Sequence, residues 1–177
     1  MPTAEILTIG TELLLGEIVD TNSAYIARVL RDKGVDLYYS ATVGDNAKRI
    51  SKAVKQAMKR AEIVITTGGL GPTVDDATRE AVAKATKVEL EFREDLWAQV
   101  EERFAAFGRT PTENNKRQAY VPAGSIAIKN EVGTAPAFIV ETEKNAVISL
   151  PGVPREMEHL LDGAVLPYLQ QRFKLRG

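Results

Sequence analysis

Short apolar segments alternate with segments of helical spacing over the first half of the chain. Strands are expected over residues 4–10, 35–43 and 62–67, and helices over residues 21–33 and 47–60. Strands that are joined by helices lie parallel in one sheet, with helices on both of its faces. The alternation therefore predicts an α/β fold, in which ligands bind at the carboxyl ends of the strands.

The third of these strands runs into a loop with three glycines and a proline, Thr66 to Thr73. Because glycine has no Cβ, backbone N–H groups in such a loop can approach a ligand closely, and a following helix N-terminus adds unpaired donors. This arrangement favours an anion. A tight turn with acids that merely cap the helix is the alternative, and the continuation through Asp75, Asp76 and Thr78 favours the ligand site.

Asp75 and Asp76 bring negative charge to this loop, and they are expected to open a helix that ends at Ala83 or Ala85. Two carboxylates repel an anion unless a divalent cation lies between them, or unless they bind hydroxyl or ring N–H groups of the ligand. The chain has no cysteine and a single histidine. Any metal is therefore expected to be a hard ion held by oxygen.

The second half of the chain is expected to continue the fold with three helices and three strands. The helices are expected over residues 93–107, 110–119 and 154–173, and the strands over residues 125–129, 136–141 and 146–150. For the second helix, Thr110 is the expected cap and Pro111 the expected first turn. Trp97 repeats at helical spacing with apolar neighbours and is expected in a core or an interface, while His159 is expected to be a structural or surface residue.

Composition limits the classes of function to consider. The chain has 177 residues, of which 44% are hydrophobic and 27% are charged, so residues 1–177 are expected to form one domain. A net charge of −1 gives no sign of a nucleic-acid-binding surface. No leader precedes the first strand and no apolar stretch reaches membrane-spanning length, so we expect a cytoplasmic protein without nucleic-acid or membrane partners.

Five motifs follow one another along the chain: Gly10–Gly16 with Asp20–Asn22, Thr66–Thr78, Asn115–Ala119, Asn130–Pro136 and Leu150–Met157. Together they resemble the N-terminal domain of the competence/damage-inducible protein CinA family. That domain is similar to the MoaB/Mog-like molybdopterin-binding proteins. The resemblance covers nearly the whole chain and implies a three-layer α/β/α sandwich around a mostly parallel sheet.

The resemblance also implies an activity, that of an ADP-ribose pyrophosphatase dependent on a divalent metal such as Mg²⁺, Mn²⁺ or Co²⁺. The expected metal ligands are Asp76 and Asp45, and the expected catalytic residues are Asp76, Glu12 and Lys116. Glu12 would act as a general base or as a second metal ligand, and Lys116 or Arg117 would add positive charge. The implied ligand- or phosphate-binding residues are Gly68, Gly69, Gly71, Thr73, Thr78, Asn22, Asn115, Gly133 and Thr134. The alternative is a molybdopterin-binding protein of molybdenum cofactor biosynthesis that holds a pterin phosphate without hydrolysing it.

Two departures from the family pattern matter. CinA proteins carry a second domain with nicotinamide mononucleotide deamidase activity, and no such domain is expected here because the sequence ends at Gly177. Ala137 stands where the pattern has glycine.

Assembly is the last expectation from the sequence. Both families are similar to proteins that form dimers or trimers, and an apolar stripe that includes Trp97, Val100, Phe104 and Phe107 has to be covered. We expect a homodimer, with a trimer as the next possibility.

Overall fold

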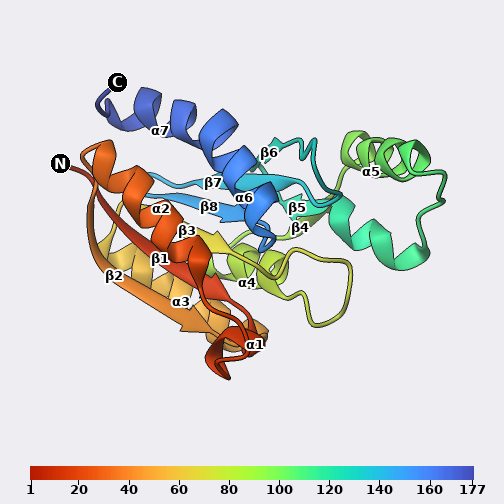
Figure 1. Cartoon of the computed structure of the whole chain (residues 1–177), viewed down its shortest axis with the longest axis horizontal. Helices are drawn as coiled ribbons and strands as arrows, with labels where there is room; N and C mark the ends of the chain where they lie inside the picture. The colour runs from red at the N-terminus through yellow and green to blue at the C-terminus, as the bar shows by residue number, and fades with distance from the viewer.

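The computed structural model describes residues 1–177, which form three layers around a six-stranded sheet (Figure 1). The strands lie in the order β2-β1-β3-β8-β7-β6. Four of them pair in parallel, and β7 and β6 are added antiparallel at one edge. The bounds are β1 Thr3–Ile9, β2 Asp36–Val43, β3 Ile63–Thr67, β6 Ile126–Ile128, β7 Ala137–Glu141 and β8 Ala146–Leu150. The predicted α/β/α sandwich with a mostly parallel sheet is confirmed.

Helices cover both faces of this sheet. On one face lie α2 (Thr21–Asp32) and a C-terminal run made of α6 (Pro154–Leu160), a π-helical turn (Leu161–Val165) and α7 (Leu166–Phe173). The other face is covered by α3 (Ala47–Arg60) and α4 (Thr78–Ala85), with α5 (Glu94–Ala106) beyond them (Figure 1). None of the helices combines the length and the apolar character needed to cross a membrane.

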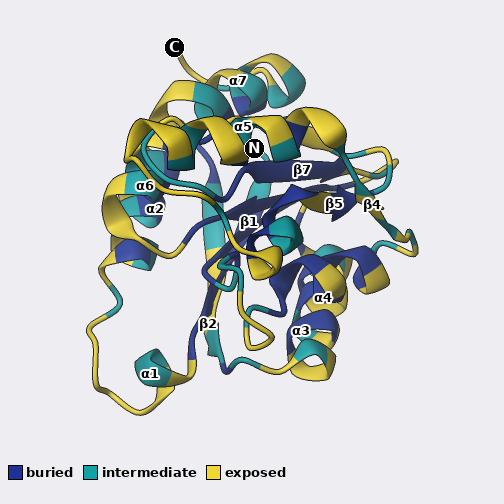
Figure 2. Ribbon diagram, turned by 90° about the vertical axis from the view of Figure 1, so that its right-hand side faces the viewer, coloured by how far each residue is buried: buried dark blue, intermediate teal, exposed yellow.

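Strand side chains alternate between two separate cores. Ile63 and Ile65 of β3 pack with α2 and the C-terminal helices, while Val64 packs with α3 and α4. All five residues of β3 are buried, as expected for a strand covered on both faces. Figure 2 shows the consequence, with buried strands between helices whose outer faces are exposed.

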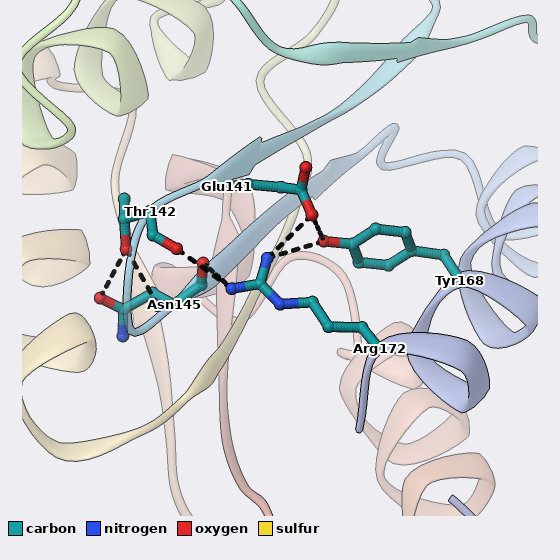
Figure 3. A network of polar contacts seen from close by, with 5 residues as sticks. All are labelled: Glu141, Thr142, Asn145, Tyr168 and Arg172. Atoms are coloured by element: carbon teal, nitrogen blue, oxygen red, sulfur yellow. Dashed lines mark hydrogen bonds and ion pairs between the residues drawn. The ribbon is translucent and has the colours of Figure 1, made fainter. Parts of the chain in front are cut away.

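A polar network fastens α7 to the hairpin between β7 and β8 (Figure 3). The Arg172 guanidinium lies 3.0 Å from the Glu141 carboxylate and donates to the carbonyls of Thr142 and Asn145, each at 3.1 Å. Tyr168 donates its hydroxyl to Glu141 over 2.6 Å, and burial together with this bond raises the pKa of Tyr168. The network lies at the end of the sheet where β7 ends and β8 begins.

Several predicted boundaries were wrong. The helix after the glycine loop begins at Thr78, so Asp75 and Asp76 lie in a turn before it. The segment expected to form a helix from Thr110 is a 3-10 helix over Glu113–Ala119, and it begins after Thr112, whose N–H donates to Asn115 Oδ1 over 2.8 Å. A four-residue helix, α1 (Thr11–Leu14), and a small sheet that pairs β4 (Leu90–Phe92) with β5 (Tyr120–Pro122) were not predicted.

The stripe on α5 is only partly exposed. Val100 is buried and Trp97 packs against the core that α3 and α4 cover, which is one of the two positions expected for Trp97. Phe107, just past the helix, is 64% exposed. The stripe therefore gives less reason for a partner chain than the sequence suggested, and the homodimer remains a prediction.

Candidate functional site

A cavity of about 620 Å³ lies where β1, β3 and β8 reach their carboxyl ends. Its walls come from the segments that follow these three strands, around residues 12–22, 67–76 and 151–156, with Asp45 after β2. The volume falls in the range that small-molecule ligands occupy. The sheet edge predicted from the alternation is therefore the edge that carries the cavity.

The glycine loop after β3 forms one wall with its backbone. Gly68 and Gly69 have φ angles of 108° and 73°, which side chains with a Cβ rarely adopt, and a Cβ on Gly69 would collide with Thr78 Oγ1. The N–H groups of Gly69, Leu70 and Gly71 donate to no acceptor in the protein. Three successive free N–H groups in a cavity wall form a suitable cradle for an anion.

A buried arginine, Arg79, supports this loop from within the protein. Its side chain donates to the carbonyl of Gly71 over 3.1 Å and to the carbonyl of Leu70, and only 3% of the residue is exposed. Burial lowers the pKa of Arg79 to about 10, with Arg117 acting in the same direction and Asp76 opposing both. Arg79 was not among the site residues predicted from the sequence.

Carboxylates supply the charge in the cavity lining. Six of them line it, namely Glu12, Asp20, Asp45, Asp75, Asp76 and Glu156, whereas no lysine, arginine or histidine does. An anionic ligand would be repelled unless a cation accompanied it, or unless it offered hydroxyl or N–H donors to these carboxylates.

The two aspartates that the resemblance implied as metal ligands each have one oxygen without a partner. Asp76 Oδ2 accepts from the N–H and the hydroxyl of Thr73, at 2.9 and 2.8 Å, and Asp45 Oδ2 accepts from the N–H of Thr11 at 3.2 Å. The other oxygen of each carboxylate accepts no hydrogen bond from the protein. No three residues of the kinds that bind metals converge to form a complete metal site.

Eight of the predicted site residues line the cavity together: Glu12, Asn22, Asp45, Gly68, Gly69, Gly71, Asp76 and Thr134. The Asn22 side-chain amide donates to Thr67 Oγ1 at 3.0 Å and to the Gly152 carbonyl at 2.9 Å, and its Oδ1 is buried without a partner. Asn22 thus joins the start of α2 to the segment after β8, and it has no free donor for a phosphate oxygen.

The other five predicted site residues lie outside this lining. Thr73 holds Asp76, and Thr78 donates its buried hydroxyl to the carbonyl of Gly68 over 2.8 Å. Asn115 belongs to the capping box with Thr112, and Lys116 lies 3.1 Å from Glu113.

The fifth, Gly133, lines a separate cavity of about 190 Å³ beside α5, whose lining also includes Thr134. A Cβ on Gly133 would collide with Glu156. His159 lies outside both cavities, with Nε2 3.7 Å from a Glu131 carboxylate oxygen. Ala137, the departure from the family pattern, is a buried residue of β7 and lines neither cavity.

Comparison with known families agrees with the fold. Residues 5–171 match the family described as a probable molybdopterin binding domain. The MoaB molybdopterin biosynthesis enzyme of Thermus thermophilus has a similar structure, with a TM-score of 0.66 over 97% of this chain and 93% of that one. Its sequence is only 21% identical, so this likeness concerns the fold alone. These matches define the class, a molybdopterin-binding-like α/β domain.

Within that class, the chain belongs to the CinA family. The CinA protein of Thermoplasma acidophilum shares 35% of its residues and has a TM-score of 0.87, with 94% of this chain and 97% of that chain covered. A relative in Halothermothrix orenii, named as a competence-damage inducible protein, is 51% identical over 172 residues, and one in Alkaliphilus oremlandii is 49% identical over 168. These alignments cover 97% and 95% of the chain but only 42% and 41% of the two relatives.

Proposed function

We propose that the chain binds a nucleotide diphosphate in the large cavity and hydrolyses ADP-ribose with the help of a divalent cation. The lining supports this proposal, because three free backbone N–H groups of residues 69–71 lie beside six carboxylates and no cationic side chain. N–H groups suit phosphate oxygens, and carboxylates suit a cation that neutralises the same phosphates.

The donor set fits a hard divalent cation. Mg²⁺ is usually bound in nucleotide sites by one or two carboxylates together with substrate phosphates and water, so three converging protein ligands are not required. Asp45 and Asp76 would hold it through the oxygens that accept no hydrogen bond in the protein. A cation in this position would neutralise charge on the diphosphate oxygens.

Glu12 is the residue of the lining to which we assign the proton transfer. A water oxygen would bond to one phosphorus while the bridging P–O bond breaks, which gives AMP and ribose 5-phosphate. The Glu12 carboxylate, on α1, would accept the proton that the water releases. The N–H groups of residues 69–71 would hold the phosphate oxygens in place during this step. Lys116 lies outside the lining, and we assign it no contact with the diphosphate.

A second candidate function is the binding of molybdopterin without hydrolysis. The matching family is described as a probable molybdopterin binding domain, and a protein of similar fold is named as a molybdopterin biosynthesis enzyme. The same N–H groups would hold a pterin phosphate. Turnover separates the two candidates, because only the first consumes its ligand.

The test is a panel of ADP-ribose, FAD, NADH and adenylylated pterin, each incubated with Mg²⁺, Mn²⁺ or Co²⁺. We expect hydrolysis of ADP-ribose to AMP and ribose 5-phosphate, and none without a divalent cation. Binding of the pterin compound with no hydrolysis of any ligand would favour the second candidate.

Asp76→Asn tests the assigned chemistry within the same assay. The amide keeps an acceptor for Thr73 but loses the charge, so we expect turnover to fall by a factor on the order of 100 while the fold is kept. Asp32→Asn is the matched control, because Asp32 is an exposed carboxylate paired with Arg31 at 2.9 Å and lies outside the cavity. Undiminished turnover in Asp76→Asn would exclude Asp76 from the reaction.

A further inference from the structure

Exposed apolar side chains are frequent on the segments that form the carboxylate-rich cavity. Twelve large apolar side chains in the chain are exposed, and six of them lie on the segments that follow β1, β3 and β8. These six are Leu14, Leu15, Ile18, Val19, Val74 and Val153. Clustered exposed apolar side chains often mark a binding site, so their concentration beside a polar cavity suggests a ligand with an apolar part.

Three of the six also line the cavity itself. Ile18 and Val19 are 56% and 80% exposed, and Val153 is 53% exposed, yet all three belong to its wall. They therefore face the cavity and solvent together, and they bury little against the protein. Such side chains can still lose exposed surface when a ligand covers them.

The two segments that carry these residues are held side by side. Asn22 Nδ2 donates to the carbonyl of Gly152 over 2.9 Å, and Val19 precedes Asn22 by three residues while Val153 follows Gly152. The free N–H groups of residues 69–71 lie on a different wall, in the segment after β3. The cavity thus has backbone donors on one wall, and on another wall it has these apolar side chains beside the carboxylates of Glu12, Asp20 and Glu156.

We infer that Ile18, Val19 and Val153 form the subsite for the planar heteroaromatic ring of the ligand. The inference rests on the proposed function, since it assumes that the diphosphate lies on the glycine loop. Aliphatic side chains bind a flat ring through its faces, which makes this subsite selective for ring-bearing diphosphates over inorganic ones. Adenine and pterin are both planar heteroaromatic rings, so the subsite could take either.

The test compares two non-hydrolysable ligands by isothermal titration calorimetry with Mg²⁺. The ligand α,β-methylene-ADP carries an adenosine on its bridged diphosphate, and methylenediphosphonate carries the bridge alone. In the double variant Ile18→Ser/Val19→Ser we expect the affinity for α,β-methylene-ADP to fall about tenfold, and that for methylenediphosphonate to stay the same. Because both side chains are largely exposed, the variant is expected to fold, and its thermal unfolding provides the check.

Leu15→Ser is the matched control, since Leu15 is 67% exposed on the same segment but does not line the cavity. Pterin-6-carboxylate, titrated in the same assay, distinguishes a pterin from an adenine. The subsite takes the ring of the ligand, pterin-6-carboxylate or α,β-methylene-ADP, whose affinity falls in the double variant. An equal loss for both diphosphates, no loss for any ring, or no binding of either ring by the unmodified protein would each overturn the inference. The inference would also be overturned if the double variant had a lower mass by light scattering than the unmodified protein and bound α,β-methylene-ADP with unchanged affinity. Ile18 and Val19 would then lie in an interface between copies of the chain.

The inference and the proposed function can fail separately. If α,β-methylene-ADP binds as expected but ADP-ribose is never hydrolysed, the ring subsite stands and the hydrolase is refuted. If ADP-ribose is hydrolysed equally well by the double variant and binding does not change, the reaction stands and the ring subsite is refuted.

Discussion

Replacing Arg79 with methionine tests how the glycine loop is held. The change keeps an unbranched side chain of similar length and removes the guanidinium that donates to the carbonyls of Leu70 and Gly71. Two acceptors lose their partner, at about 1–3 kcal/mol each. Burial lowers the pKa of Arg79 to about 10, which corresponds to a penalty of about 3 kcal/mol for the buried charge, and the variant no longer carries that charge.

The two contributions to stability oppose each other, so their net effect on the free energy of unfolding is small. The effect on ligand binding is expected to be larger. We expect Arg79→Met to lower the free energy of unfolding by no more than about 3 kcal/mol. The affinity for methylenediphosphonate with Mg²⁺ should fall at least about tenfold, because the Leu70 carbonyl, which shares a peptide plane with the N–H of Gly71, loses the donor that holds it. Urea unfolding and calorimetry measure the two quantities.

Arg172→Met is the matched control, since it makes the same substitution in the network that fastens α7 (Figure 3). It removes donors to two carbonyls and to Glu141, so it should lower stability and leave the affinity unchanged. The reasoning is refuted if Arg79→Met binds the diphosphate as tightly as the unmodified protein, or if both variants lose affinity equally.

Four further outcomes are expected. Gly69→Ala should lower the free energy of unfolding by about 1–3 kcal/mol, because the Cβ collides with Thr78 and φ is 73°, and a urea midpoint equal to that of the unmodified protein would contradict this. Gly71→Ala should weaken diphosphate binding more than it lowers stability, since its Cβ would lie 2.6 Å from Asp76 Oδ2. Calorimetry measures the loss of affinity, and urea unfolding of the same variant measures the loss of stability. The hydrogen bond to Asp162 raises the pKa of Tyr25 from 10.0 to about 12. The stability that this bond contributes is therefore complete below pH 10 and is lost between pH 10 and about 12. In an ultraviolet titration of the tyrosines, Tyr25→Phe should remove the ionisation that occurs near pH 12. Light scattering should give a mass near twice 19.3 kDa if the predicted homodimer forms, and a single 19.3 kDa species would refute it.

Local chemistry accounts for the parts of the protein that could be predicted from the sequence. Buried strands such as β3 consist of consecutive β-branched and apolar residues, and α3 keeps one apolar stripe from Ala47 to Arg60, so these elements were predicted within a residue of their bounds. The glycine loop was found for the same reason, since its backbone angles require glycine at two positions. The position of the cavity at the carboxyl ends of the strands followed from the parallel strand order.

Tertiary structure decided which of the predicted residues can reach a ligand. Thr78, Asn115 and Lys116 have suitable chemistry in the sequence, but one buries its hydroxyl against Gly68, one caps a 3-10 helix and one pairs with Glu113. Arg79 became visible only in the structure, because nothing local marks a helix position as lying beneath a loop. Sequence patterns report what a residue does within its own segment, whereas the partners of a buried polar group come from segments that the fold brings together.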